Sequence, residues 1–225
     1  MLRKSVPRAP SRVLERGRRT VIDFESNAVA RLFDAAETVF ANEGFAGASM
    51  DQIATLAGLN KATIYYHIGN KEKLYQEILK RHFSRFADRL ERELADCEDP
   101  LEGLRGIVRI HAEEYSRSRA STRTIAHELA DGLSRTGAEV RAIVWRILGV
   151  TKRYVDTAGA RGLLPPLDLL SVHYLLVGPL ILHEIVIPVA PTAAEPPSDW
   201  RPPESTLAAM QDLIARIVVP ALAGR

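Results

Sequence analysis

Apolar residues recur at intervals of three and four along most of the chain, and no segment shows the strict alternation expected of a β-strand. This spacing is typical of helices that bury one face, so the sequence predicts an all-α protein. The first helix is expected over residues 26–43 and should end at Gly44. Its apolar stripe consists of Val29, Leu32, Phe33, Ala36, Val39 and Phe40.

Two short helices are predicted next, separated by a tight turn. Ser49 and Gln52 have the spacing of a capping box, which marks the start of a helix. Gly58 favours the end of that helix, and Asn60 is a suitable N-cap for a third helix over residues 61–67. A helix, a glycine turn and a second short helix together make a helix-turn-helix pattern.

The remaining sequence predicts a larger helical domain. Capping residues mark several of its helices: Glu72 suits the positive end of one, Asp99–Pro100 begins another and Ser121 a third. The expected helices cover residues 71–96, 100–118, 121–132, 137–160 and 204–222. Three parts therefore follow along the chain, namely a disordered basic arm (1–25), a helix-turn-helix domain (26–72) and a helical ligand-binding and dimerisation domain (73–225).

Residues 167–187 are apolar on nearly every face, and a stretch of this length raises the possibility of a membrane span. It is interrupted by His173, Pro179, His183 and Glu184. These interruptions favour a central buried helix, kinked at Gly178–Pro179, and no membrane association. A proline-rich linker is expected over residues 188–204.

Charge is distributed unevenly along the 225 residues. The net charge is +2, yet residues 1–20 contain seven basic residues and one acidic residue, so this segment carries +6 and the rest carries −4. A basic arm of this kind suggests a polyanion, either nucleic acid or an anionic membrane surface, although a solvated tail has the same composition. Cys97 is the only cysteine, which excludes an intramolecular disulfide and suits a reducing cytosol. No apolar run follows the basic N-terminus, so a cytoplasmic protein without a signal peptide is expected.

The helix-turn-helix pattern predicts DNA binding, because the second helix of such a unit enters the major groove. Ala62 is small enough for close approach, and several nearby side chains have tips that can reach phosphates or bases. These candidates are Lys61, Thr63, Tyr65, Tyr66, His67 and Lys71. Either Tyr65 or Tyr66 is alternatively expected to pack into the core. The arm, including Arg16, Arg18 and Arg19, would supply charge to the DNA backbone or minor groove.

Residues 28–79 resemble a known family. The run AAETVFANEGFAGASMDQIATLAGLNKATIYYHIGNKEKLYQEIL is similar to the DNA-binding domain of TetR/AcrR-type transcriptional regulators. The resemblance implies a homodimeric, all-helical repressor of operator DNA, with a ligand-sensing C-terminal domain and a dimer interface on the last two helices. It places Lys61, Ala62, Thr63 and Tyr65 at positions that contact bases and nearby phosphates, and Ser49, Tyr66, His67 and Lys71 at backbone-contact positions. Ile68 and Asp51 depart from the family pattern.

No enzyme motif accompanies these features. The segments HEL at 127 and HEI at 183 lack the second histidine of a zinc-protease helix, and the sequence contains no nucleophile elbow, phosphate loop or paired-cysteine motif. We therefore expect no catalytic residue, no metal and no cofactor. A small helical enzyme or binding protein, in which the helix-turn-helix is only structural, remains the alternative function.

A ligand pocket is the remaining hypothesis for the second domain. His111 shares an apolar face with Leu104, Ile107, Val108 and Tyr115, so its imidazole should point inward, either to a hydrogen bond in the core or to a bound ligand. The expected effector is small and hydrophobic or aromatic. The candidate ligand-binding residues are His111, Tyr115, Trp145, Thr151, Tyr154, His173 and Tyr174.

Overall fold

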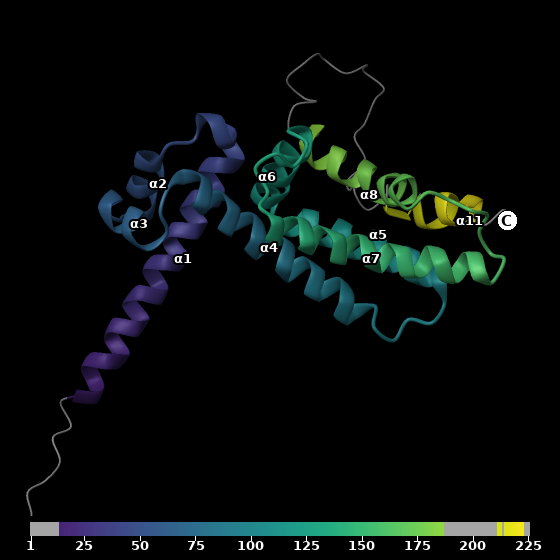
Figure 1. Ribbon diagram of the computed structural model, residues 1–225, viewed down its shortest axis with the longest axis horizontal. Coiled ribbons are helices and arrows are strands. Elements are labelled where there is room, and N and C mark those ends of the chain that lie inside the picture. The colour runs from purple at the N-terminus through teal and green to yellow at the C-terminus, as the bar shows by residue number, and fades with distance from the viewer. Residues whose placement is uncertain (1–13, 187–210, 213, 223–225) are drawn as a thin grey trace, which may run out of the picture.

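The computed structural model describes residues 14–186, 211–212 and 214–222, and every regular element among them is helical. Three helices form a small domain at one end of the molecule (Figure 1). These are α1 (Leu14–Gly47), α2 (Met50–Ala57) and α3 (Lys61–His67). The larger domain consists of α4 (Lys71–Glu93), α5 (Pro100–Arg117), α6 (Arg119–Ala130), α7 (Ala138–Ala160) and α8 (Leu169–Val186), with a π-helical turn η1 (Ile214–Val218) and α11 (Val219–Leu222).

Helix α1 begins earlier than the sequence pattern predicted. Its backbone is helical from Leu14, so the expectation of a disordered arm over residues 1–25 is wrong for residues 14–25. The apolar stripe that marked the helix starts only at Val29, but no proline interrupts residues 14–28 before it. Residues 1–13 of the arm lie outside the described residues. At the other end, Gly44 breaks the helical geometry with φ of 64°, as its glycine identity predicted.

The caps of the helix-turn-helix unit are confirmed. Ser49 Oγ accepts a hydrogen bond from the Gln52 amide, and Gln52 Oε1 accepts one from the Ser49 amide, which completes the capping box of α2. Gly58 ends α2 in the left-handed conformation, and Asn60 Oδ1 accepts a hydrogen bond from the Ala62 amide at the start of α3. The domain core is formed by Phe40, Ile53, Ile64, Leu74 and Tyr75.

Helix α4 passes from the small domain into the larger one (Figure 1). Its first turns place Leu74 and Tyr75 in the core of the small domain, and its later turns pack against α7. In the larger domain α5 packs against both α7 and α8, while α6 lies between α1 and α8. The start of α6 differs from the prediction, because Ser118 rather than Ser121 is its N-cap. Ser118 Oγ accepts the Ser121 amide hydrogen bond, so Ser121 belongs to the first turn.

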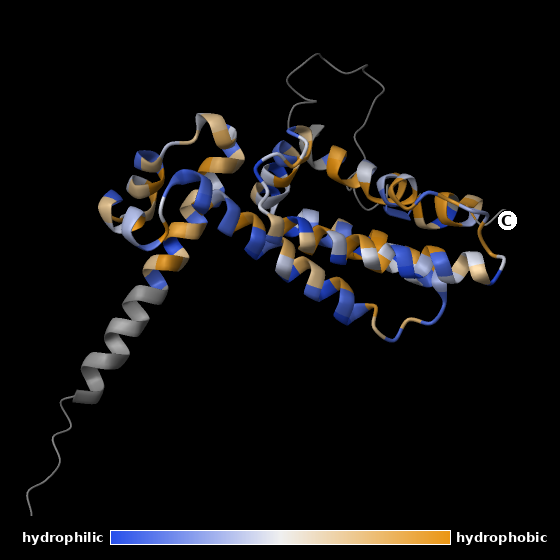
Figure 2. Ribbon diagram, in the orientation of Figure 1, coloured by the Kyte–Doolittle hydropathy of each residue, from blue (hydrophilic) through white to orange (hydrophobic). Residues whose placement is uncertain are grey.

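Helix α8 is buried on one face only, so the prediction of a helix buried all round is wrong for this chain by itself. Val172, Leu176, Val177 and Leu180 are buried. Its other face leaves apolar side chains exposed, namely Leu170, Tyr174, Leu175 and Leu182. Hydrophobic residues dominate this helix in Figure 2. Among the described residues, no helix is both long and apolar enough to cross a membrane.

The C-terminal prediction is only partly covered. A helix over 204–222 was expected, and the described part contains η1 and α11 at its end. The predicted linker over 188–204 lies outside the described residues, as do residues 205–210. Arg105 Nε donates to the carbonyl oxygen of Ala215 at 3.3 Å, which ties η1 to α5.

Candidate DNA-binding interface and ligand pocket

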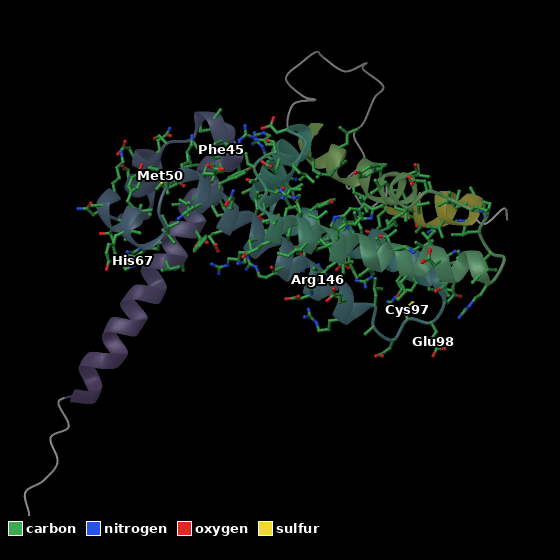
Figure 3. All side chains as sticks on the ribbon, in the orientation of Figure 1. Phe45, Met50, His67, Cys97, Glu98 and Arg146 are labelled. Atoms are coloured by element: carbon green, nitrogen blue, oxygen red, sulfur yellow. The ribbon has the colours of Figure 1, made fainter. Side chains whose placement is uncertain are left out.

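Helix α3 buries a single apolar side chain against the small domain. Ile64 is its only buried residue, whereas Lys61, Ala62, Thr63, Tyr65, Tyr66 and His67 are all exposed. The side chains of α3 therefore face outward along most of its circumference. Figure 3 shows His67 on the small domain, apart from Arg146 and Cys97 on the larger one.

Both candidate tyrosines are exposed, so the expectation that one packs into the core is wrong. Tyr65 is 46% exposed and Tyr66 is 86% exposed. The aromatic core of this domain instead takes its rings from Phe40, Phe45 and Tyr75, with Phe40 and Tyr75 centroids 4.8 Å apart. The ring of Tyr66 packs edge-on against His67, with a centroid separation of 4.9 Å.

Asp51 pairs with a predicted DNA contact. Lys61 Nζ lies 2.8 Å from Asp51 Oδ2, and both side chains remain largely exposed. The hydrogen bond to Asp51 raises the pKa of Lys61. The acidic residue that departs from the family pattern thus sits on α2 beside the N-terminus of α3, where it offsets the charge of the first residue of that helix.

Ser49 and Lys71, two of the four candidates for contact with the DNA backbone, already have partners within the protein. Ser49 uses its hydroxyl in the capping box of α2. The Lys71 ammonium donates to the carbonyl oxygens of Phe45 at 2.7 Å and Ala48 at 2.9 Å. It also lies 4.5 Å from the centroid of the Phe45 ring. The side chains of Arg16, Arg18 and Arg19 lie outside the described residues, although their backbone belongs to α1.

A cavity of about 140 Å³ lies within the larger domain, between α4, α5, α6, α7 and α8. We call it the chamber. It brings together four of the seven predicted ligand-binding residues, namely His111, Tyr115, His173 and Tyr174. Most of its wall is apolar, with Phe83, Phe86, Ile125, Val144, Ile147 and Val177 among the lining residues. A mostly apolar cavity with a few polar groups is the usual form of a small-molecule site.

The chamber histidines are buried and neutral. His111 Nδ1 lies 2.8 Å from the carbonyl oxygen of Ile107, which gives the inward-pointing imidazole the expected partner. Burial, and secondarily the nearby His173, lowers the pKa of His111 to about 3. Burial likewise lowers the pKa of His173 and of His82 to about 4. At neutral pH these rings can exchange hydrogen bonds with a ligand without adding charge to the chamber.

The three remaining ligand candidates do not line the chamber. Thr151 is buried behind it, and its hydroxyl lies 2.9 Å from His173 Nδ1. Tyr154 instead donates its hydroxyl hydrogen to the carbonyl oxygen of Leu94 at 2.8 Å. Trp145 is 63% exposed on α7 and lies outside the lining. The sequence named all three as candidates, but it could not show which side chains of one helix face a cavity.

Sequence reasoning missed the contribution of α4 to the chamber. His82, Phe83 and Phe86 line it, and the His111 and Phe86 ring centroids are 4.6 Å apart. The sequence predicted a helix over residues 71–96, but it gave no sign that one face of this helix would line a cavity. Within the described residues, no three His, Cys, Asp or Glu side chains gather closely enough to hold a metal ion.

Residues 32–78 match the family model described as bacterial regulatory proteins, tetR family. The chain is also 33% identical over 152 residues to the HTH-type transcriptional repressor NicS of Pseudomonas putida, a stretch covering 66% of this chain and 71% of NicS. The chain belongs to the TetR family. It is accordingly a transcriptional regulator rather than an enzyme, and the predicted fold class is confirmed.

Two solved structures have the fold of this TetR-family regulator at low sequence identity. AibR, in complex with isovaleryl coenzyme A and operator DNA, is 22% identical with a TM-score of 0.66, covering 86% of this chain and 98% of AibR. FadR from Bacillus subtilis, in complex with stearoyl-CoA, is 18% identical with a TM-score of 0.62, covering 85% and 97%. These likenesses concern the fold alone.

Proposed function

We propose that this protein is a ligand-responsive repressor. A homodimer holds a near-palindromic operator through its two α3 helices and releases it when a small, largely apolar effector enters the chamber. The observation that carries the DNA-binding part is the exposure of α3, which buries only Ile64 and leaves its other six residues free to enter a groove. The complex of AibR with operator DNA and an acyl-coenzyme A supports this type of regulation.

The α3 candidates divide as the resemblance to the TetR family implies. Lys61, Ala62, Thr63 and Tyr65 are proposed to contact bases and nearby phosphates, whereas Tyr66 and His67 would contact the backbone. The basic arm, with Arg16, Arg18 and Arg19, is proposed to add affinity without sequence preference, because phosphate contacts act through counterion release. Lys71 supports the interface indirectly, since its ammonium is bonded to carbonyl groups at the end of α1.

Dimerisation is proposed through α8 and the C-terminal segment. The exposed face of α8 presents Leu170, Tyr174, Leu175 and Leu182 to solvent in the single chain. A contiguous apolar face of this kind is usually covered by a partner, and a two-fold interface would bury it on both copies. Two α3 helices could then occupy successive major grooves about 34 Å apart.

The proposed route from chamber to DNA passes through the loop after α6. Leu133 lines the chamber and adopts a positive φ of 57°, which is uncommon for a residue with a branched side chain. Two residues further on, the Arg135 guanidinium lies 4.8 Å from the centroid of Phe45, at the end of α1. Gln76 of α4 donates to the carbonyl oxygen of Arg135 at 3.0 Å. A ligand that moves Leu133 would therefore disturb contacts with α1 and α4, two helices that contribute to the core of the DNA-binding domain.

The proposal is tested by two linked titrations. Gel shifts with DNA from upstream of its own gene should reveal a specific complex, and calorimetry should measure effector affinity with and without that DNA. Binding linkage requires operator DNA to weaken effector binding by the factor by which effector weakens operator binding, with couplings of about 1–3 kcal/mol being typical. If no specific DNA complex forms, the proposal of a repressor is refuted. Equal effector affinities in the two titrations would refute release by ligand.

A further inference from the structure

A second cavity, of about 440 Å³, adjoins the chamber. We call it the vestibule. Its wall comes from four helices. The lining includes Glu37 of α1, Arg85 and Arg92 of α4, Arg117 of α5 and Ser121 of α6. His82 and Glu114 line both cavities, so the two spaces meet at these side chains. The vestibule thus lies between the DNA-binding domain and the apolar chamber.

The wall of the vestibule has an excess of positive charge. It contains four arginines against three carboxylates. The Glu114 carboxylate accepts hydrogen bonds from Arg117 at 3.0 Å and from Arg89 at 3.3 Å. The Asp88 carboxylate also lines the vestibule, and it lies 2.7 Å from the guanidinium of Arg146 on α7. Arg146 itself does not line the vestibule.

Three of the four arginines remain accessible to a ligand. Within the described part of the chain, Arg85 and Arg92 form no ion pair, and both are exposed on α4. Arg117 is also accessible, because 60% of its side chain is exposed while it contacts Glu114. Guanidinium groups favour carboxylates and phosphates, to which they can donate two parallel hydrogen bonds.

The chamber suits a different chemical group. Its volume of about 140 Å³ is close to that of an engineered apolar cavity of about 150 Å³ that binds benzene. The walls are mostly apolar, and the histidines that line it are neutral at physiological pH. The chamber lining includes the Glu114 carboxylate but no lysine or arginine, so an anion would lose its hydration there without gaining an opposite charge. An anionic effector must therefore keep its charge outside the chamber.

We propose that the chamber and vestibule form one bipartite site for an amphiphilic anion. An apolar group about the size of one aromatic ring or a short branched chain fills the chamber, and an anionic head group binds Arg85 and Arg117 in the vestibule. This inference rests on the proposed function and specifies the effector class. The anion can belong to a free carboxylic acid or to a phosphorylated carrier joined to the acyl group as a thioester.

The position of Glu37 connects this site to DNA binding. Glu37 of α1 and Arg85 of α4 both line the vestibule. Burial raises the pKa of Glu37, and the positive charge of Arg85 partly opposes this rise. An anion bound by Arg85 would compete with Glu37 for this charge and would repel it. The attraction between α1 and α4 would fall, and with it the fixed orientation of the domain that carries α3.

Four probes separate the contributions of ring, charge and carrier. Benzoate and benzamide have nearly the same shape but differ in charge, whereas benzoyl-coenzyme A and coenzyme A differ in the presence of the ring. Calorimetry on the full chain should give at least tenfold tighter binding of an anionic ring probe than of benzamide, since hydrogen bonds to charged groups are the strong ones. Tight benzoate binding identifies the free acid as the source. Tight binding of benzoyl-coenzyme A but of neither benzoate nor coenzyme A identifies the carrier.

Variants then assign the charge preference to the vestibule. The double variant Arg85→Gln/Arg117→Gln should lose the preference for the anionic probe while keeping its affinity for benzamide. Arg161→Gln, an exposed arginine at the end of α7 outside both cavities, is the matched control and should leave the preference intact. Val144→Phe, which fills part of the chamber, should weaken every ring probe.

Three results would overturn the inference: equal affinities for benzoate, benzoyl-coenzyme A and benzamide, retention of the charge preference in the double variant, or no binding of any probe. Thermal unfolding of each variant identifies loss of fold. The gel shift with operator DNA contains no effector. It therefore tests the proposed DNA binding independently of the probe-binding results.

Discussion

The ammonium of Lys71 and the carbonyl oxygen of Phe45 are 2.7 Å apart, so the first residue of α4 caps the last turn of α1. Carbonyl groups at a helix C-terminus have no partner within their own helix, and a lysine is well suited to satisfy them. The same ammonium lies over the Phe45 ring. Lys71 is thus a brace between two helices of the DNA-binding domain.

Replacing Lys71 with alanine should destabilise the protein as well as weaken DNA binding. A hydrogen bond to a charged group contributes about 1.5–3 kcal/mol, so a loss of this order is expected in the free energy of unfolding. Specific and random DNA should be affected alike. Denaturant unfolding and gel shifts measure the two effects, with Lys73→Ala in the same exposed first turn as the control. Unchanged stability with lost DNA affinity would assign Lys71 to phosphate contact alone.

Asp51→Asn should strengthen DNA binding. The substitution removes a negative charge beside α3 and releases Lys61 from its ion pair at 2.8 Å. One additional phosphate contact would make the plot of log affinity against log salt steeper by about 0.9. Binding to random DNA should increase as well, because the effect is electrostatic. An unchanged slope in fluorescence anisotropy titrations would mean that this pair does not face the DNA. Glu139→Gln, which releases Lys80 on the larger domain, is the matched control.

Tyr65→Ala should reduce sequence discrimination. The side chain is half exposed on α3, and loss of a base contact typically weakens specific binding by about 10- to 100-fold, with a smaller effect on random DNA. Competition gel shifts give the ratio of the two affinities. Leu56→Ala, at an exposed position on α2, should leave that ratio nearly constant. If Tyr65→Ala preserves the ratio, this position does not read bases.

Leu175→Glu should dissociate the proposed dimer. Leu175 lies on the exposed apolar face of α8, and a two-fold interface would place two buried carboxylates near each other. Light scattering should change from twice the chain mass to the monomer mass of 24.9 kDa. Leu56→Glu places the same charge on an exposed leucine of the DNA-binding domain and should remain dimeric. A wild-type chain that is monomeric at micromolar concentration would refute the interface itself.

Stability should decrease below neutral pH because of the buried histidines. The pKa values of His111, His173 and His82 are about 3, 4 and 4 in the folded protein, below the value of about 6.5 in an unfolded chain. Between pH 6.5 and 4 the unfolded chain therefore binds more protons, so the free energy of unfolding falls as pH falls. Each such proton contributes a slope of about 1.4 kcal/mol per pH unit.

His111→Leu should remove one proton from this dependence. Urea unfolding at pH 7.5, 6.0 and 5.0 should show a slope flatter by up to about 1.4 kcal/mol per pH unit than in the wild type. His67→Ala, at an exposed histidine of α3, is the control and should keep the wild-type slope. Equal slopes for His111→Leu and the wild type would place the acid sensitivity in other groups.

The amino-acid sequence by itself determined the local elements of this protein. The capping box of Ser49 and Gln52, the Asn60 cap and the Asp99–Pro100 start of α5 all appear where they were predicted. Each depends on residues within three or four positions of one another, so short-range hydrogen bonds decide it. The bounds of α3 follow from the same local signals, whereas the exposure of both Tyr65 and Tyr66 does not.

Only the tertiary structure decided which side chains meet across the chain. Lys71 was predicted to be free for phosphate, yet it bonds carbonyls more than twenty positions earlier. His111 and Trp145 were both candidate ligand-binding residues, but packing of five helices turns His111 into the chamber and leaves Trp145 exposed. The vestibule depends on α1, α4, α5 and α6 together. Helical periodicity specifies the face of a residue on its own helix, whereas the relative orientation of the helices specifies what that face contacts.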